Sequence, residues 1–295
     1  MRFFIYLFFA AVLSISPLIV AESYQGPIFD AHSHLSKWSD PEQAHKHIIE
    51  VGFGKAALFV DIDRVDEVLN YSHDKFLVFV DPFERTKVKT GYGQKEVRYE
   101  FSEKRLSDIK SALEAGKVAG LGEIYFRLGY APFAPEGIHT PVRGKSARAL
   151  FEVARVYKVP VQIHLDADYV SELEQVLGDN RDVTIILAHC GFMKPGKLSA
   201  LMDGHPNLYA ETSLIFNSMI PRFANLPLED GRLRPEWKSL LIRHADRILL
   251  GTDYSYFRAD QAPKLLAYYR QVLGLLLRDK AEQIAYENFE RLFIK

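Results

Sequence analysis

Two histidines separated by one residue stand at the end of a short apolar run near the start of the chain, where residues 28–34 read IFDAHSH. If this run is a β-strand, its side chains alternate between two faces, so His32 and His34 point the same way. Imidazole nitrogens are common ligands of zinc and other transition metals, and the pair can share one cation. A His-x-His pair alone does not distinguish a metal site from two buried histidines, so further ligands are needed.

Four more side chains of the ligand type end other apolar runs. They close the segments GLGE, VQIH, ILAH and LLGTD, and they are Glu123, His164, His189 and Asp253. One acid or histidine at such a place is more often an ordinary satisfied polar group than a ligand. Repetition at four strand ends is not explained in that way, and imidazole with carboxylate suits zinc, iron or manganese.

Eight short apolar runs alternate with helical patterns and predict the elements that position these residues. Near-continuous apolar strands alternating with helices are typical of a parallel sheet covered by helices. Eight such units within 295 residues favour a closed (β/α)8 TIM barrel in a single domain. The expected strands are 28–32, 56–61, 76–82, 118–125, 159–165, 184–190, 207–212 and 247–253. The expected helices are 41–51, 102–115, 145–157, 168–177, 197–203, 235–244 and 261–273, with only a short turn after the second strand.

An open doubly wound sheet is the alternative architecture. It normally carries a Gly-rich phosphate loop after its first strand, whereas the turn here reads AHSHLSKW. Three connections are longer than a barrel needs, at 83–101, 126–144 and 213–233. All three follow strands, so in a barrel they lie on the face where catalytic residues gather.

The N-terminal residues indicate export. Arg2 precedes an apolar run that ends in the small residue Ala21, which is the layout of a secretory signal peptide. We therefore expect a signal peptide at 1–21 and a barrel domain at 22–295, with a secreted, periplasmic location. An uncleaved membrane anchor is the alternative, because the run is about long enough to span a bilayer. The single cysteine, Cys190, cannot form an intramolecular disulfide, so the fold must rest on its apolar core.

Charge and composition limit the classes of binding partner that we expect. There are 37 basic and 38 acidic residues, so the formal net charge of -1 gives no electrostatic reason to expect nucleic acid. We expect a small-molecule substrate, no membrane association after cleavage of the signal peptide, and leave a homo-oligomer open. Arg127 and Arg143 lie in or beside a long connection that follows a strand. A guanidinium there can hold a substrate carboxylate or phosphate, so both are candidate substrate-binding residues.

The order of the ligand-type residues resembles the amidohydrolase superfamily. The resemblance covers nearly the whole of 22–295 and rests on the first, fourth, fifth, sixth and eighth expected strands. The ending YENFERLF, at 286–293, is similar to the Asn-x-x-Arg-Leu-Phe ending of the amidohydrolase-related branch. The segment GEI, at 122–124, resembles the TatD-type metal nucleases instead. The resemblance implies a metal-dependent TIM-barrel hydrolase.

The same resemblance implies how the ligands divide. His32, His34 and Asp253 belong to one ion, and His164 and His189 belong to the other. Superfamily members with a carboxylated lysine between two metals carry it on the fourth strand. This strand has no lysine after Lys117, so Glu123 is the expected bridge.

Six candidate ligands exceed the three protein ligands and one water of a simple catalytic zinc site. We favour two divalent ions over one ion whose remaining neighbours serve the substrate, with zinc expected and manganese or iron(II) as alternatives. Asp253 is also expected to take the proton of the attacking water, and His189 is the second candidate for that role.

Four functions are compatible with this site. The first is hydrolysis of a small ester, amide, lactone or phosphoester by metal-activated water. The second is decarboxylation of an aromatic or unsaturated carboxylic acid, which related enzymes generally carry out without a fourth-strand carboxylate, so Glu123 favours hydrolysis. A TatD-type nuclease is the third, and both the expected export and the slight excess of acidic over basic residues disfavour it. The fourth is a non-catalytic metal-binding barrel, which the full ligand set and the long connections disfavour.

The expected signal peptide can be tested on the exported protein. N-terminal sequencing should give a chain that begins at Glu22, because Ala21 is the small residue that ends the apolar run. A full-length chain recovered in the membrane fraction would contradict cleavage.

Overall fold

A computed structural model describes residues 22–35, 39–89, 95–128, 138–216, 226–254 and 260–294. Within these ranges eight parallel strands form a TIM barrel, in the order β1-β2-β3-β6-β8-β9-β10-β13. The predicted fold class is confirmed. The strands are β1 (Asp30–His34), β2 (Ala56–Val60), β3 (Phe76–Val80), β6 (Gly120–Leu128), β8 (Val161–Leu165), β9 (Ile185–Leu187), β10 (Leu208–Glu211) and β13 (Ile248–Leu249).

Backbone hydrogen bonds bring the eighth strand against the first. The Ala31 amide donates to the Leu250 carbonyl at 2.8 Å, and the His34 amide donates to the Tyr254 carbonyl at 2.8 Å. These bonds lie just beyond the end of β13, so the segment that carries Asp253 runs directly beside β1. The carboxyl ends of the first and last strands therefore meet at one rim.

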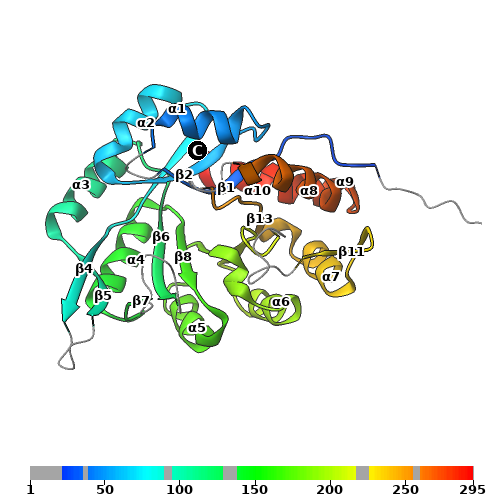
Figure 1. Ribbon diagram of the computed structural model, residues 1–295. Coiled ribbons are helices and arrows are strands. Elements are labelled where there is room, and N and C mark those ends of the chain that lie inside the picture. Colours follow the sequence, from blue (N-terminus) through cyan, green and yellow to red (C-terminus); the bar gives the residue numbers. More distant parts are fainter. Residues whose placement is uncertain are drawn as a thin grey trace, which may run out of the picture.

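The helices follow one another around the strands in chain order (Figure 1). Ser102 caps α3, where its hydroxyl accepts from the Arg105 amide at 3.0 Å, and prolines begin α6 and α7. The helices are α1 (Pro41–Ala44), α2 (Val65–Ser72), α3 (Glu103–Glu114), α4 (Lys145–Tyr157), α5 (Val170–Asp179), α6 (Pro195–Gly204), α7 (Pro235–Arg243), α8 (Ala262–Gly274), α9 (Arg278–Glu282) and α10 (Asn288–Phe293).

The prediction of only a short turn after the second strand is wrong. A short 3-10 turn (Ile62–Arg64) leads into α2, which has eight residues. Its buried stripe is narrow, formed by Val65, Val68 and Ser72, while Asp66 and Glu67 occupy its first turn. So short an apolar repeat gives little periodic signal, and the helix is stabilised mainly by packing on the barrel.

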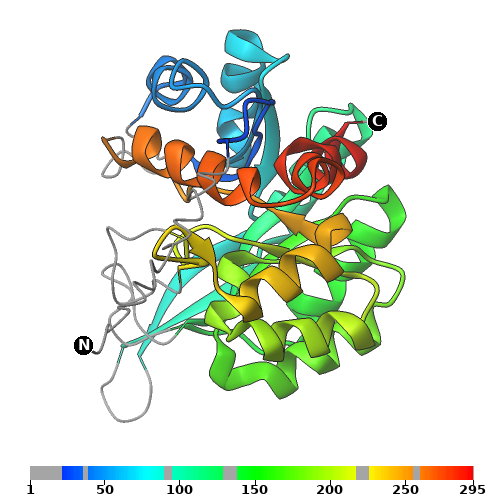
Figure 2. The same cartoon turned by 90° about the vertical axis from the view of Figure 1, so that its right-hand side faces the viewer.

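The long connection at 83–101 contains an antiparallel hairpin that the sequence did not predict. It consists of β4 (Phe83–Lys89) and β5 (Lys95–Phe101), paired along their whole length. Figures 1 and 2 show the two strands reaching away from the barrel. A second small strand, β7 (Ile138–His139), joins β5 to the end of β6.

The third long connection contains another short antiparallel pair, β11 (Leu228–Glu229) and β12 (Arg232–Leu233). Segments 129–137 and 217–225, which fall within two of the predicted long connections, lie outside the described residues.

Two of the strands that end earlier than predicted carry candidate site residues beyond their ends. The sixth was expected at 184–190 but β9 stops at Leu187, and the eighth was expected at 247–253 but β13 stops at Leu249. The backbone then turns left-handed, with φ of 54° at His189 and 48° at Asp253. A non-glycine residue rarely adopts this conformation outside turns and functional sites.

The C-terminal helix packs against the inside of the barrel through aromatic side chains. Phe293 of α10 lies edge-on to Phe79 of β3, with ring centroids 5.1 Å apart. Phe79 in turn lies 5.3 Å from Phe59 of β2. All three side chains are buried, so an apolar layer fills the barrel below its polar rim.

No helix within the described ranges is long and apolar enough to cross a bilayer. The predicted signal peptide at 1–21 lies outside those ranges. Its cleavage and the periplasmic location stay predictions.

Asn288 of α10 provides a stability test. Its side-chain amide is buried and donates to the carbonyls of Ala245 and Ile248 at 2.7 and 2.8 Å, which ties α10 to the start of β13. A buried carbonyl left without a partner costs about 1–3 kcal/mol, so Asn288→Ala should lower the free energy of unfolding by about 2–5 kcal/mol. Urea unfolding would measure this, with Glu290→Ala at an exposed position of α10 as the control. Equal losses in the two variants would contradict the role assigned to Asn288.

Candidate metal centre

His32, His34 and Asp253 form one group of possible ligand atoms. The Nε2 atoms of the two histidines are 3.1 Å apart, and Oδ1 of Asp253 lies 3.7 Å from that of His32 and 3.3 Å from that of His34. Tetrahedral ligands about 2.1 Å from a cation are separated from one another by about 3.4 Å. The spacing of these three atoms therefore fits a shared cation.

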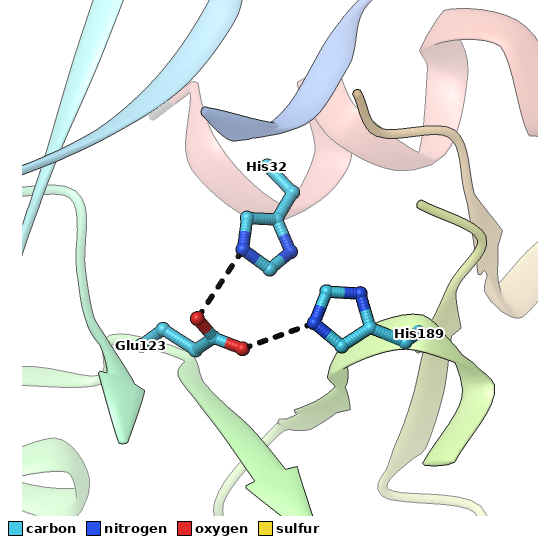
Figure 3. Close-up of side chains that lie close together, drawn as sticks. All are labelled: His32, Glu123 and His189. Carbon is cyan, nitrogen blue, oxygen red and sulfur yellow. Dashed lines mark ion pairs between the residues drawn. The ribbon is translucent and has the colours of Figure 1, made fainter. Parts of the chain in front are cut away.

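Glu123 lies between this group and two other histidines. Its Oε2 is 3.5 Å from Nε2 of both His32 and His34. Its Oε1 is 3.0 Å from Nδ1 of His164 and 3.3 Å from Nε2 of His189. Figure 3 shows His32 and His189 approaching opposite oxygens of the carboxylate. The two oxygens thus face different histidine pairs, which is the geometry that a bridging carboxylate requires.

The strands explain why these side chains converge. In β8 the side chains of Gln162 and His164 share one face, toward the barrel interior, while Ile163 packs with the outer core. Glu123 stands near the middle of β6, the neighbouring strand. His189 reaches the same point from the left-handed turn after β9.

The ring nitrogens that point away from the centre also have polar neighbours. Nδ1 of His32 lies 2.9 Å from Oε2 of Glu211, and Nε2 of His164 lies 3.1 Å from Oδ1 of Asp166. Nδ1 of His189 lies 2.8 Å from Oγ of Ser213. An oxygen that accepts from the outer nitrogen fixes the ring and leaves the inner nitrogen free to bind a metal.

Glu211, Asp166 and Ser213 were missed by the sequence analysis. Glu211 is the last residue of the short apolar run LYAE, which forms β10. This position at the end of a run was the available signal. Asp166 directly follows β8. Only the distances across the barrel show that these side chains contact histidine rings.

Asp30 shares the inward face with the two histidines of β1, but its carboxylate is bonded to backbone amides and hydroxyls rather than to their rings. Its carboxylate accepts from the backbone amides of His32 and Thr252, at 3.0 and 2.9 Å, and from the Thr252 and Ser33 hydroxyls. Burial raises its pKa to about 6, against these hydrogen bonds, which lower it. Asp30 therefore positions the backbone where β1 and the end of the eighth strand meet.

Electrostatics inside the barrel favour added positive charge. Burial disfavours the charged form of His32, but the carboxylates of Glu123 and Glu211 outweigh burial and hold its pKa well above the ordinary value. Burial likewise opposes protonation of His164, and Asp166 and Glu123 raise its pKa to about 9. For Glu123 burial favours the neutral acid, but the neighbouring histidines hold its pKa well below the ordinary value.

These shifts have one physical cause, which is buried carboxylate charge in contact with imidazoles. A divalent cation would compensate that charge in place of the histidine protons, because metal and proton compete for the same nitrogen. The donor set, its spacing and its charge therefore fit a divalent metal. All six predicted ligands are brought together: His32, His34, Glu123, His164, His189 and Asp253.

The two candidate substrate-binding arginines form ion pairs with acids of α5 rather than with the ligand cluster. Arg127 is paired with Glu172 of α5 at 2.9 Å and lies over the Tyr169 ring. Arg143 is more exposed and is paired with Asp179 at the end of α5. A role for either in substrate binding stays a prediction.

A family comparison agrees with the fold. The amidohydrolase family model matches residues 100–294. That stretch contains Glu123, His164, His189 and Asp253, while the His-x-His pair of β1 lies before it. No curated protein matches the sequence significantly.

Solved structures share the fold at low sequence identity. A dihydroorotase from Campylobacter jejuni is 14% identical, with 90% of this chain and 82% of that chain covered and a TM-score of 0.59. A TatD homologue from Escherichia coli K12 is 16% identical, with 90% and 97% covered and a TM-score of 0.60. A 2,6-dihydroxybenzoate decarboxylase from Rhizobium is 14% identical, with 91% and 99% covered and a TM-score of 0.52. At these identities the likeness shows the fold alone.

The geometry predicts the metal content of a variant. Changing His32 and His34 together to alanine removes both imidazoles of the first group, so the protein should lose at least one equivalent of metal while its far-UV circular dichroism stays unchanged. Elemental analysis of purified protein would measure this, with His73→Ala, an exposed histidine after α2, as the control. Metal content equal to that of the control would contradict the assignment of His32 and His34 as metal ligands.

Proposed function

The chain belongs to the amidohydrolase family, and on that premise we propose that it is a metal-dependent hydrolase of small esters, amides, lactones or phosphoesters. The observation that carries the proposal is the Glu123 carboxylate, whose two oxygens face two different histidine pairs. A non-catalytic metal-binding barrel would not need a partly accessible acid among its ligands, and Asp253 is such an acid.

The residues divide between two cation positions. His32, His34 and Asp253 would hold the first ion, His164 and His189 would hold the second, and Glu123 would contact both. Zinc is the proposed ion, with manganese or iron(II) as alternatives that suit the same donors. When bound, such an ion supplies Lewis-acid activation of water or of a substrate oxygen.

Asp253 is the proposed proton acceptor. Its side chain is 13% exposed and Oδ1 faces the two histidines of β1, so it lies at the edge of the buried cluster. His189 is the other candidate, but its side chain is only 2% exposed and its two nitrogens face Glu123 and Ser213. Because a general base must reach the proton that it removes, the position of Asp253 is the better one.

Glu123 also bears on the choice between hydrolysis and decarboxylation. Related decarboxylases generally lack a carboxylate on the fourth strand, whereas here that carboxylate touches four histidines. Hydrolysis is therefore the proposed reaction. A screen over esters, lactones, amides, phosphoesters, aromatic carboxylic acids and single-stranded DNA separates it from decarboxylation and nuclease action.

Two further parts of the proposal rest on the sequence. Export to the periplasm is supported by the residues at 1–21, and substrate anchoring by Arg127 and Arg143 is supported by their types and their places in or beside a long connection.

The role of Asp253 can be tested on the substrate that the screen finds. Asp253→Asn keeps an oxygen ligand but removes the base, and loss of a general base typically lowers the rate by about 10²–10⁴-fold. We expect kcat/KM to fall by that factor or more while substantial metal is retained. Asp168→Asn, a carboxylate in the turn after β8 that no predicted role uses, is the control. Turnover within a few-fold of wild type in metal-loaded Asp253→Asn would move the proton to His189.

A further inference from the structure

Glu211 is a buried acid that none of the predicted roles uses. It ends β10, the seventh barrel strand, and its side chain is completely buried. Its Oε2 lies 2.9 Å from Nδ1 of His32, on the side of the ring opposite the candidate cation position. Burial of a carboxylate charge is unfavourable in free energy unless the charge is paired. The contact between Glu211 and His32 therefore requires an explanation.

A second side chain approaches the same nitrogen. Nε2 of Gln162 in β8 also lies 2.9 Å from Nδ1 of His32. The two contacts require opposite positions of the imidazole proton. Glu211 accepts, so it requires a proton on Nδ1 and leaves the Nε2 lone pair free to face Glu123 and His34. Gln162 donates through its amide, which requires a bare Nδ1 and places the proton on Nε2.

Glu211 also reaches the second histidine pair. Its Oε2 accepts from the Ser213 hydroxyl at 2.7 Å and from the His189 backbone amide at 3.3 Å. The same hydroxyl oxygen is 2.8 Å from Nδ1 of His189. One carboxylate therefore fixes a ring of the first group directly and a ring of the second group through Ser213.

The backbone leaves room for this carboxylate at Gly251. A Cβ at that position would clash with Oε1 of Glu211 and would also press on the Cβ of His32. The glycine of the segment LLGTD thus permits the close approach of the acid to the end of the eighth strand.

We infer that Glu211 is a positioning residue that selects the metal-binding tautomer of His32 and orients His189, so that one buried acid prepares both cation positions. This inference rests on the proposed metal centre. It assigns Glu211 no contact with substrate or cation.

The test compares two variants that change the two neighbours of the same nitrogen. Glu211→Gln keeps the size of the side chain and removes the charge that accepts from Nδ1. Loss of such an outer partner typically weakens metal binding by about 10–100-fold, and we expect a loss in this range. Gln162→Leu removes the competing donor, so its metal affinity should equal or exceed that of wild type.

The readouts are independent of turnover. Metal-free protein is titrated with Co²⁺, and both the affinity and the visible absorption of the bound ion are recorded. Thermal unfolding with and without Co²⁺ provides a second measure, because a ligand that binds the folded state raises the melting temperature, and a tighter ligand at the same concentration raises it more. The metal-free melting temperatures show whether either variant is merely less stable.

Each result of the Co²⁺ titrations has one interpretation. Wild type that binds no Co²⁺ contradicts the proposed function itself. Wild type that binds, with Glu211→Gln binding equally well and giving the same spectrum, overturns the inference alone. A larger loss in Gln162→Leu than in Glu211→Gln would assign the tautomer to Gln162 instead.

Ser213→Ala keeps the inference testable if Glu211→Gln does not fold. It removes the hydroxyl that joins Glu211 to the ring of His189 and keeps the contact of Glu211 with His32, so a smaller but measurable loss of Co²⁺ affinity is expected. Unchanged affinity in Ser213→Ala would overturn the part of the inference that concerns the second position.

Discussion

The centre of the barrel depends on compensation of a buried carboxylate. Glu123 is 3% exposed, and an ionised acid at that depth is stable only when cations or donors surround it. The protein places four imidazoles around it, divided between its two oxygens. Removal of one imidazole would leave part of the charge unpaired, so the positions of the histidines and of the acid depend on one another.

This arrangement needs a scaffold that brings distant segments to one point, and the closed barrel provides it. Parallel strands with their carboxyl ends at one rim bring together residues as far apart in the chain as His32 and Asp253. The apolar layer below the rim forms the lower boundary of the polar cluster. His32 lies edge-on to Phe59, with ring centroids 5.1 Å apart, and Phe59 is backed by Phe79. The C-terminal helix, through Phe293, completes that layer.

The sequence predicted the parts of this structure that have a strong local signal. Each barrel strand is a short apolar run, and a ligand-type residue in or after such a run stands out, which is why Glu123 and His164 could be proposed as ligands. The helix α2 was missed because its buried stripe comprises few residues. Glu211 was missed for a different reason. It also ends a short apolar run, but its role depends on a contact with His32, 179 residues away in the chain, which no local pattern shows.

The left-handed backbone after β9 shows why strand alternation alone could not place His189. An uninterrupted strand would turn successive side chains to opposite faces. Instead His189, Cys190 and Phe192 have φ between 49° and 54°, a conformation that costs about 1–3 kcal/mol at each non-glycine residue. The turn brings the rings of His189 and Phe192 side by side, 5.2 Å apart and nearly parallel, and sets Phe192 against His164 as well. The surrounding barrel must therefore stabilise a strained turn, and in return one aromatic side chain supports both histidines that face Oε1 of Glu123.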